Sequence, residues 1–572
     1  MTLIVVLVAA ASVKTVVLAQ LHAHPLLQPV GGLDTEVYVR LARRAAGGDW
    51  MLGPDPYFVS PLYVYFLAVI LKVTGSLLAA RLAQITLGTL AVGLVFAVAR
   101  RLYGGVAAAT AAVLAAATGA FTFYEVVLLQ SALDPFLTAL GLALLARALE
   151  TDRAGDFALV GLAIGVHALN RPNVLLWLAT LATLLAFTRG RRRAAVVVLL
   201  GGLAAVAPVT LRNRAVSGEW ILVSSHGGLN FYIGNNETAD GAYHSVAGIT
   251  PQIQGQAEDA RRVAEAAAGR PLSVAETSRY FSGRAWEWIR RQPGRALILF
   301  VRKLAYTLNQ TDLPLNYSFA YYRDDEGTAL RLLPVGPWLL VPLGLLGLVA
   351  APSRSGGRDA WTWKAFAPVY AVSVAAFFVA GRYRLPLLVS LCVAAGAGAT
   401  HLLTLAREGK RKALGYAAVG MAVVALFASW DFRLDDGRAA ETTEMVVALI
   451  DRGRIDEARA LIARAAGEAA ETVAVDLARA NNALAEAREA RGVALFQLGR
   501  LEAAAEELEV ACALDPARAS AQLNLAVVRA EQGRYEEART RVDAALRLRP
   551  DYPQARGLRA ALDRMARPQR GR

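Results

Sequence analysis

Acidic side chains next to apolar segments are the residues of this chain that could carry out chemistry. Asp34 follows the first apolar segment and opens an amphipathic stretch. A carboxylate at a membrane surface can take a proton from a hydroxyl group when its neighbours tune its pKa, so Asp34 is a candidate catalytic base. Glu125 is a second acidic residue next to an apolar segment. Each has a structural alternative: Asp34 as the N-cap of a helix, and Glu125 as a helix-end residue.

Long apolar segments must position these carboxylates. The chain has 572 residues, 55% of them hydrophobic, and the apolar runs lie before Trp430. A membrane-crossing helix needs roughly 20 apolar residues, so we predict about eleven spans, some of them short. The predicted spans are 2–21, 81–99, 105–121, 129–147, 156–170, 173–188, 194–211, 333–351, 363–380, 385–405 and 413–430.

Basic residues in the short loops orient the spans. The apolar segment 61–75 is short, and we predict an interfacial or re-entrant helix there. If it does not cross, the arginine-rich loops all fall on one side, which the positive-inside rule assigns to the cytoplasm. This explains most of the net charge of +14, and we predict no nucleic-acid partner. Asp34, Glu125 and a long loop, 212–332, then lie on the periplasmic or extracellular side of a bacterial inner (plasma) membrane.

The C-terminal part contains an internal repeat. Gly499 and Gly533 are separated by 34 residues, and so are Pro516 and Pro550. This is the period of tetratricopeptide repeats, in which stacked helix pairs share a core. An earlier copy around Gly453 lies 46 residues before Gly499, which predicts an insertion of about 12 residues. The repeats predict a fold and leave two roles open, a spacer and a peptide-binding groove.

The domain organisation follows from these patterns. We predict an all-α chain with a polytopic membrane helix bundle over residues 1–430. A polar linker, 431–437, leads to an α-solenoid of tetratricopeptide repeats over residues 438–572. The two cysteines lie in different domains, so no disulfide framework is predicted.

The first outside segment resembles a known family. Asp34, Tyr38, the turn Gly48-Asp49-Trp50 and Pro61-Leu62-Tyr63 follow one another in the order seen in GT-C glycosyltransferases of family 39, the protein O-mannosyltransferase and aminoarabinose transferase type. The resemblance covers roughly residues 1–430. It implies a polyprenyl-phosphate sugar donor, a lipid, glycan or protein acceptor, and Asp34 as the general base. It also implies that Glu125 is a second catalytic carboxylate that assists Asp34, and that Tyr38 and Tyr63 contact the substrate.

The reaction implied by the resemblance is a single displacement with inversion. The lipid phosphate is a good leaving group, so the protein must mainly position the reactants and neutralise charge. Some members of the superfamily use a divalent metal ion. The chain has no Asp-x-Asp at 34–36, and its histidines form no zinc motif. The use of Mg or Mn therefore stays open.

A lipid phosphate needs fixed cations. Guanidinium groups match phosphate oxygens well, and the alternative for these side chains is to reach lipid head groups. The candidate donor-phosphate ligands are Arg171, Arg302, Lys303, Arg382 and Arg384.

The long loop 212–332 adds candidate sugar ligands. Its strand-like alternation and the glycines at 227–228 and 234 predict a compact extracytoplasmic domain with tight turns. Asn230 and Tyr232 could hydrogen-bond a sugar, and the alternative is that the polar residues here only form turns.

The resemblance, together with the predicted topology, implies an integral-membrane glycosyltransferase, and two alternatives remain. One is an oligosaccharide ligase of the same superfamily, which would use a glycan on a pyrophosphate. The other is a non-catalytic scaffold for envelope assembly that binds a protein partner through its repeats. The donor distinguishes the glycosyltransferase from the ligase, because one uses a sugar on a monophosphate and the other a glycan on a pyrophosphate. The scaffold would keep its function when Asp34 and Glu125 are replaced, whereas either enzyme would lose it.

Overall fold

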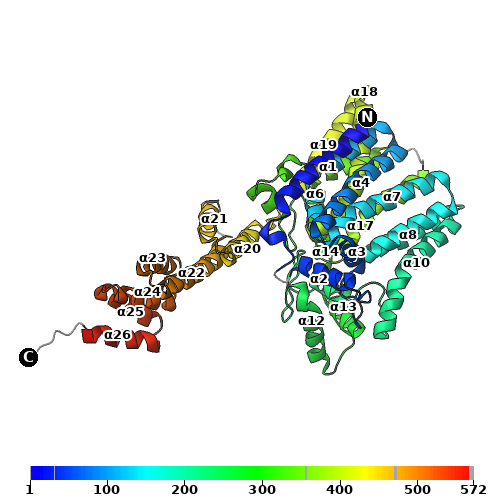
Figure 1. Ribbon diagram of the computed structural model, residues 1–572. Helices are drawn as coiled ribbons and strands as arrows, with labels where there is room; N and C mark the ends of the chain where they lie inside the picture. The colour runs from blue at the N-terminus through cyan, green and yellow to red at the C-terminus, as the bar shows by residue number, and fades with distance from the viewer. Residues whose placement is uncertain (1, 31–32, 354–356, 469–472, 566–572) are drawn as a thin grey trace, which may run out of the picture. The chain divides into compact units, whose positions relative to one another are not determined.

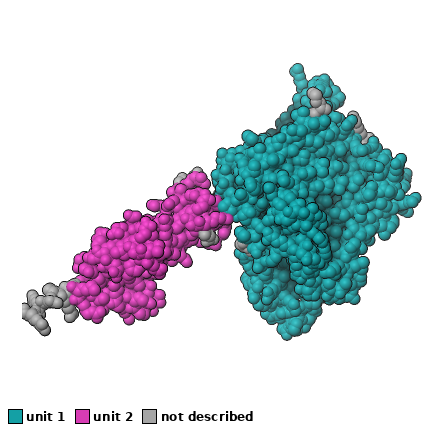
Figure 2. All heavy atoms as spheres, in the orientation of Figure 1, with its two compact units in different colours: residues 1–437 teal, residues 438–572 magenta. Residues whose placement is uncertain are grey.

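The structure is a computed structural model that describes residues 2–30, 33–353, 357–468 and 473–565 (Figure 1). Helices make up the described chain, and the described residues form no strand beyond one isolated bridge between Thr118 and Val335. The expected all-α class is therefore confirmed. The chain divides into two compact units, Met1–Gly437 and Arg438–Arg572 (Figure 2).

The first unit holds the apolar helices. Among the described residues, six helical segments are long and apolar enough to cross a membrane: Leu3–Leu21 in α1 (Thr2–Leu21), α4 (Leu77–Tyr103), Gln130–Thr151 with α7 (Asp134–Thr151), α10 (Arg192–Ser217), α18 (Leu385–Arg407) and α19 (Arg411–Ala428). The shorter apolar helices are α3 (Pro61–Thr74), α5 (Gly105–Ala116), α8 (Ala154–Asn170), α9 (Leu175–Ala186) and α15 (Pro337–Ala350). The chain is an integral membrane protein, and the number of crossings stays a prediction.

Two predicted spans are interrupted. The span 105–121 ends as α5 at Ala116, and a second helix, α6 (Gly119–Val126), follows. The break occurs where Val335 N–H donates to the Ala117 carbonyl at 3.1 Å. The span 363–380 begins partway through α16 (Gly357–Lys364), continues as α17 (Phe366–Ala375) and ends in extended backbone, where Val379 N–H donates to the Gly241 carbonyl at 2.9 Å. In both places backbone groups pair with a distant segment instead of continuing the helix.

Small residues bring the membrane helices close together. A Cβ added at Gly161 of α8 would lie 2.1 Å from the Val198 carbonyl oxygen of α10. In α15, a Cβ at Gly347 would lie 1.8 Å from the Ala394 carbonyl oxygen of α18. Helices in lipid associate through close packing because lipid supplies no hydrophobic drive between them. These two contacts therefore hold the bundle that carries the loops.

The loop 212–332 folds into a helical cap, by which we mean α11 (Gly227–Gly234), α12 (Ile253–Ala268), α13 (Val274–Arg291) and α14 (Pro293–Leu308). The expected strand-like alternation and tight glycine turn are wrong here, because Gly227–Gly228 begins a helix. A Cβ at Gly228 would lie 2.0 Å from the Ser278 carbonyl oxygen of α13. The glycine is thus required by helix contact and not by a turn. The cap has its own apolar core, which includes Leu229, Ile233 and Phe281.

The second unit is built of paired helices. They are α20 (Arg438–Asp451), α21 (Ile455–Glu468), α22 (Val473–Gln497), α23 (Leu501–Leu514), α24 (Ala519–Glu531), α25 (Tyr535–Leu548) and α26 (Pro553–Met565). Gly453, Gly499 and Gly533 occupy the turns inside the pairs, with φ of +72°, +72° and +76°. The predicted insertion falls around α22, which has 25 residues against 13 in α24.

Candidate active site

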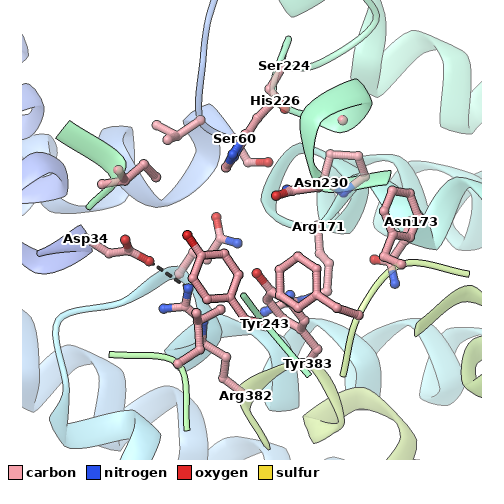
Figure 3. A pocket seen from close by; sticks show the side chains of 18 of the residues that line it. Asp34, Ser60, Arg171, Asn173, Ser224, His226, Asn230, Tyr243, Arg382 and Tyr383 are labelled. Carbon is pink, nitrogen blue, oxygen red and sulfur yellow. Dashed lines mark hydrogen bonds and ion pairs between the residues drawn. The ribbon is translucent and has the colours of Figure 1, made fainter. Parts of the chain in front are cut away.

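One cavity of about 190 Å³ lies in the first unit where four segments predicted to be outside the cytoplasm meet (Figure 3). These are the segment after α1, the turn before α9, the helical cap and the turn before α18. The cavity is lined by charged and polar side chains together with apolar ones. Its lining includes Asp34, Tyr38, Ser60, Gln130, Arg171, Asn173, Ser224, His226, Asn230, Tyr243, Gln256, Asn316, Ser373, Arg382 and Tyr383.

Asp34 faces this cavity from the amino end of α2 (Asp34–Ala46). It is the first helical residue and Leu33 is the N-cap, so the simple capping role is wrong. The residue is 8% exposed, and Arg382 Nη2 donates to its Oδ2 at 2.7 Å. A carboxylate in the first turn of a helix is stabilised by the positive end of the helix dipole. The local fold therefore holds Asp34 as a buried carboxylate at the cavity wall.

Arg382 lies on the short turn Gly381–Tyr383 and is the partner of Asp34. Burial alone would lower the pKa of its guanidinium. The negative charge of Asp34 raises the pKa by more than burial lowers it, so the pKa lies above its ordinary value. The guanidinium therefore stays charged. Its Nε atom is buried and has no hydrogen-bond partner among the described residues. A buried donor without a partner is costly, which makes this atom a ready ligand for an anion in the cavity.

Arg171 lines the cavity from the other side of Tyr383. Its Nε donates to Asp134 Oδ2 at 2.7 Å, and Asn170 Nδ2 donates to Asp134 Oδ1 at 2.9 Å. Its guanidinium lies over the Tyr383 ring, 4.9 Å from the centroid. The buried Asp134 thus fixes the orientation of Arg171. The two arginines flank Tyr383, because Arg382 also lies over that ring, at 5.5 Å.

Tyr38 and Tyr63 have different positions. Tyr38 lines the cavity and donates its hydroxyl to Gln130 Oε1 at 2.8 Å. Burial raises the pKa of its phenol, so the group stays neutral. Tyr63 is fully buried behind it, with its ring edge-on to Tyr38 at 5.2 Å and its hydroxyl donated to Gln84. Tyr63 therefore supports Tyr38 and does not line the cavity.

The helical cap supplies the opposite wall. Asn230 was expected there, whereas His226, Tyr243 and Gln256 were missed by sequence reasoning. The His226 ring packs against Phe58 with the centroids 4.5 Å apart. Gln256 Nε2 donates to the Tyr243 hydroxyl at 3.0 Å. These residues form no motif, and only their polar character in an outside loop could have pointed to them.

Glu125 does not line the cavity. It is 1% exposed on α6 and forms a buried ion pair with Lys14 of α1. Lys14 also donates to the Thr122 hydroxyl at 3.4 Å. A Cβ at Gly88 would lie 2.1 Å from the Glu125 carboxyl carbon, so α4 leaves space for this side chain. The geometry gives Glu125 a role in joining α1, α4 and α6.

The remaining candidate phosphate ligands lie outside the cavity lining. Arg384 pairs with Asp312 at 2.9 Å and donates to the Asn309 carbonyl at 2.5 Å. Lys303 is buried and donates to the carbonyls of Gly234 at 2.9 Å and Phe377 at 2.7 Å. Arg302 is exposed on α14.

Tyr232 also lies outside the cavity lining and packs in the cap against Phe281, with the ring centroids 5.7 Å apart. The hydrogen bonds from Lys303 connect the end of α11 to the segment after α17. That segment includes Phe377, which lines the cavity.

A divalent metal ion was left open by the sequence. The described residues bring no three His, Cys, Asp or Glu side chains together in a way that could hold one. Asp34 is paired with Arg382, and Glu36 lies 3.6 Å from Arg40. The side chains of the described residues do not fit a resident metal ion.

Comparison with known families finds one match within each unit. The family model described as dolichyl-phosphate-mannose-protein mannosyltransferase matches residues 58–211. A tetratricopeptide repeat model matches residues 495–562. These matches confirm the resemblance drawn from the sequence, a GT-C-type glycosyltransferase domain followed by tetratricopeptide repeats. No curated protein matches the chain.

Solved structures give more distant similarities. ArnT from Cupriavidus metallidurans, bound to undecaprenyl phosphate, is 15% identical, with a TM-score of 0.41 over 94% of this chain and 79% of that one. The oligosaccharyltransferase of Archaeoglobus fulgidus, tethered with an acceptor peptide, is 13% identical, with a TM-score of 0.40. That alignment covers 80% of this chain and 58% of the archaeal protein, so the chain spans less than two thirds of its length.

Proposed function

We propose that this chain is a membrane glycosyltransferase that transfers a sugar from a polyprenyl-phosphate donor to an acceptor hydroxyl. The family model that matches residues 58–211 is named for enzymes that use dolichyl-phosphate mannose. The proposal places the cavity on the periplasmic or extracellular face of a bacterial inner membrane, in accord with the loop charges. The acceptor is a lipid, a glycan or a protein.

The Asp34–Arg382 pair is the observation that carries the proposal. Transfer from a lipid phosphate needs a base for the acceptor and a cation for the leaving group. Both are present in one cavity, 2.7 Å apart, and the arginine still has a buried Nε without a partner. Arg171 provides a second guanidinium, held in place by Asp134. Because the two arginines are tethered, little reorganisation is needed when charge develops on the phosphate.

The proposed step is one displacement at the anomeric carbon. The acceptor oxygen attacks this carbon as Asp34 takes the hydroxyl proton, forming a new glycosidic bond. The bond between the anomeric carbon and the phosphate oxygen breaks, and its electron pair goes to the phosphate. Arg382 and Arg171 stabilise the resulting polyprenyl phosphate. Protonated Asp34 then returns its proton to solvent or to the leaving phosphate, and the anomeric configuration is inverted.

Asp34→Asn is the direct test. The amide keeps the size of the side chain and removes the base, so we expect transfer to fall by roughly 100-fold or more, within the usual range for general base catalysis. The assay follows transfer of labelled sugar from polyprenyl-phosphate mannose in reconstituted membranes. Glu36→Gln is the matched control, because Glu36 lies on the same helix outside the cavity lining.

Three outcomes would contradict parts of the proposal. Near wild-type transfer by Asp34→Asn would remove Asp34 as the base. Transfer only from a pyrophosphate-linked glycan would identify an oligosaccharide ligase instead. Full biological function of an Asp34→Asn, Glu125→Gln double variant would favour a scaffold that binds its partners through the repeats.

A further inference from the structure

The cap wall of the cavity carries polar atoms that the proposed chemistry does not use. Gln256 is 4% exposed, and its Oε1 has no hydrogen-bond partner among the described residues. His226 Nε2 is likewise buried with no partner in hydrogen-bond geometry, although the imidazole lies close enough to Gln256 for that amide to raise its pKa against the effect of burial. Both residues line the cavity. Buried polar atoms are rarely left unpaired in native structures, so these two indicate a ligand that supplies the missing partners.

The two atoms are held in fixed positions. The Gln256 amide nitrogen donates to the Tyr243 hydroxyl at 3.0 Å and to the Pro251 carbonyl at 3.2 Å, which leaves only its oxygen for a ligand. His226 is fixed by its ring contact with Phe58. The cap is also tied to the helix that carries Asp34, because Arg40 donates to Gln254 Oε1 at 3.0 Å. The cap wall is therefore built against the catalytic wall.

The cap wall carries no formal charge at neutral pH. Its side chains are Ser224, His226, Asn230, Tyr243 and Gln256. Burial lowers the pKa of His226 to about 4, so the imidazole is neutral. Burial raises the pKa of Tyr243 to about 12, so the phenol is neutral as well. Figure 3 shows His226 and Ser224 across the cavity from the Asp34–Arg382 pair.

All charges of the cavity lining lie on the opposite wall and are already balanced. Asp34 is the single carboxylate among the described lining residues, and it is paired with Arg382. Arg171 is paired with Asp134. A sugar with an ammonium group would find no unpaired carboxylate, and a sugar acid would find no cation on the cap wall. Burying such a charge without a partner is costly.

From this arrangement we infer that the cap wall is the sugar subsite, and that the transferred sugar is uncharged and recognised through its hydroxyl groups by His226, Asn230, Tyr243 and Gln256. A hydroxyl group can both donate and accept a hydrogen bond. A sugar hydroxyl can therefore donate to Gln256 Oε1, and another can accept from His226 Nε2 when that ring nitrogen carries the proton. The inference rests on the proposed function and deepens it, because it states the class of donor sugar. Neutral hexoses and pentoses fit, whereas amino sugars and uronic acids do not.

A donor panel tests the inference. Wild-type protein in reconstituted membranes is given polyprenyl phosphate carrying mannose, glucose, aminoarabinose or glucuronic acid, and kcat/KM is measured for each. We expect a neutral sugar to exceed both charged sugars by at least about 100-fold, as expected when a binding site leaves buried groups unpaired with the wrong substrate. A preference for the amino sugar or the uronic acid would overturn the inference and leave the proposed function intact. Transfer from none of the donors, pyrophosphate-linked glycans included, would overturn the proposed function itself.

Two variants of Gln256 make the test specific. Gln256→Leu should lower kcat/KM for the neutral donor by roughly 10- to 100-fold, because it removes the acceptor atom. Inhibition by free polyprenyl phosphate should not change, since the phosphate end is untouched. Gln256→Glu should shift the preference toward the amino-sugar donor by about 10-fold or more, because it places a carboxylate on the cap wall.

Ala257→Glu is the matched control for the charge change. Ala257 is exposed, lies next to Gln256 on α12 and does not line the cavity, so the donor preference of this variant should equal that of the wild type. Thermal unfolding in detergent shows whether each variant is folded. Folded Gln256 variants with wild-type donor preference and wild-type kcat/KM would exclude Gln256 from sugar recognition and overturn the assignment of this wall.

Discussion

At the scale of single residues, Arg382 is the side chain on which the cavity's chemistry depends most. Arg382→Lys keeps the positive charge but loses the planar set of donors that contacts Asp34 and leaves Nε free. We expect kcat/KM for the lipid-linked donor to fall by about 10-fold or more, since lysine does not replace arginine at a site with two directed bonds. The measurement is initial transfer rate against donor concentration in reconstituted membranes.

The control for Arg382 is Arg43→Lys, a change at an exposed position of α2 outside the cavity lining that should leave the rate unchanged. Arg382→Ala is less informative, because removing one partner of a buried pair costs roughly 3–5 kcal/mol of stability. An Arg382→Lys protein with wild-type kcat/KM would show that the guanidinium does not contact the leaving group.

His226 makes a prediction about pH. The folded pKa of about 4 lies below the ordinary histidine value of 6.5. Between these values the unfolded chain binds a proton that the folded chain does not. Stability should therefore fall as the pH drops from 6.5 toward 4, and this contribution is fully present above 6.5. Thermal unfolding of the wild type and of His226→Gln, compared from pH 4.5 to 7.5, isolates the effect.

The same neutral imidazole should leave donor binding without a step near pH 6.5. A plot of donor KM against pH should therefore be superimposable for the wild type and His226→Gln over pH 5.5–7.5, apart from a constant factor. An inflection near 6.5 that disappears in His226→Gln would mean that the ring is charged in the working enzyme.

The sequence predicted some of these residues and missed others for physical reasons. Asp34, Arg171 and Arg382 were expected from residue type and from their place at the ends of spans. Tyr38 was expected from the family resemblance and Asn230 from its polar side chain in the long loop, and all five line the cavity. Tertiary packing decides whether such a side chain faces the cavity or forms an ion pair or hydrogen bonds elsewhere in the fold. Glu125, Arg384 and Lys303 have the right chemistry and the right end of a helix, yet each is occupied elsewhere. His226 and Gln256 were missed because no periodic pattern marks them.

At the scale of the elements, the buried ion pair between Lys14 of α1 and Glu125 of α6 is expected to stabilise the packing of these two helices. Both side chains are 1% exposed. Replacing one partner leaves an uncompensated charge in the apolar bundle, so Lys14→Met or Glu125→Gln alone should destabilise the protein, by roughly 3–5 kcal/mol. The double variant removes both charges and should recover much of that loss. Thermal unfolding in detergent of the four proteins gives the coupling energy.

The transfer activity of the same four proteins shows whether Glu125 has a structural or a catalytic role. We expect the double variant to keep most of the wild-type rate, because Glu125 does not line the cavity. A double variant that is folded and stable but inactive would restore the catalytic role first assigned to Glu125.

Helix positions were predicted well, and helix interruptions were not. Apolar windows locate α1, α4, α10, α18 and α19 because a span is a composition over many residues. The breaks after α5 and α17 depend on single backbone hydrogen bonds to distant segments, at Ala117 and Val379. A hydrogen bond between segments far apart in the sequence cannot be predicted from the residues around either end. The same limit explains why the glycines at the start of α11 were assigned to a turn.

At the scale of the whole molecule, the two units have separate apolar cores. The clusters around Leu508, Leu484 and Val542 lie within the second unit, and the cap core lies within the first. The tetratricopeptide period predicted the second unit because its repeated glycine turns are local features, with positive φ at each of the three turns. The separate cores imply that the membrane unit folds and works without the repeats.

Truncation after Gly437 tests this independence. Residues 430–437, mostly assigned to a linker, are bound to the first unit: Asn309 Nδ2 donates to the Trp430 carbonyl at 2.9 Å, and Ser318 Oγ donates to the Asp436 carbonyl at 2.7 Å. A chain ending at Gly437 should therefore keep its unfolding temperature and its rate with a simple acceptor within about twofold, since changes at distant, independent sites add little to one another. Thermal unfolding and the reconstituted transfer assay measure both.

A chain ending at Ser429 is the informative comparison. It removes the carbonyl partners of Asn309 and Ser318, and Asn309 is fully buried, so its amide would be left without that partner. A buried group that loses its partner costs about 1–3 kcal/mol, and the shorter chain should unfold at a lower temperature than the longer one. The Asn309 carbonyl also accepts from Arg384, in the turn next to Arg382, so transfer should fall as well. Equal stability and activity of the two truncated chains would show that residues 430–437 are a plain tether, and loss of activity after Gly437 would mean that the repeats take part in catalysis.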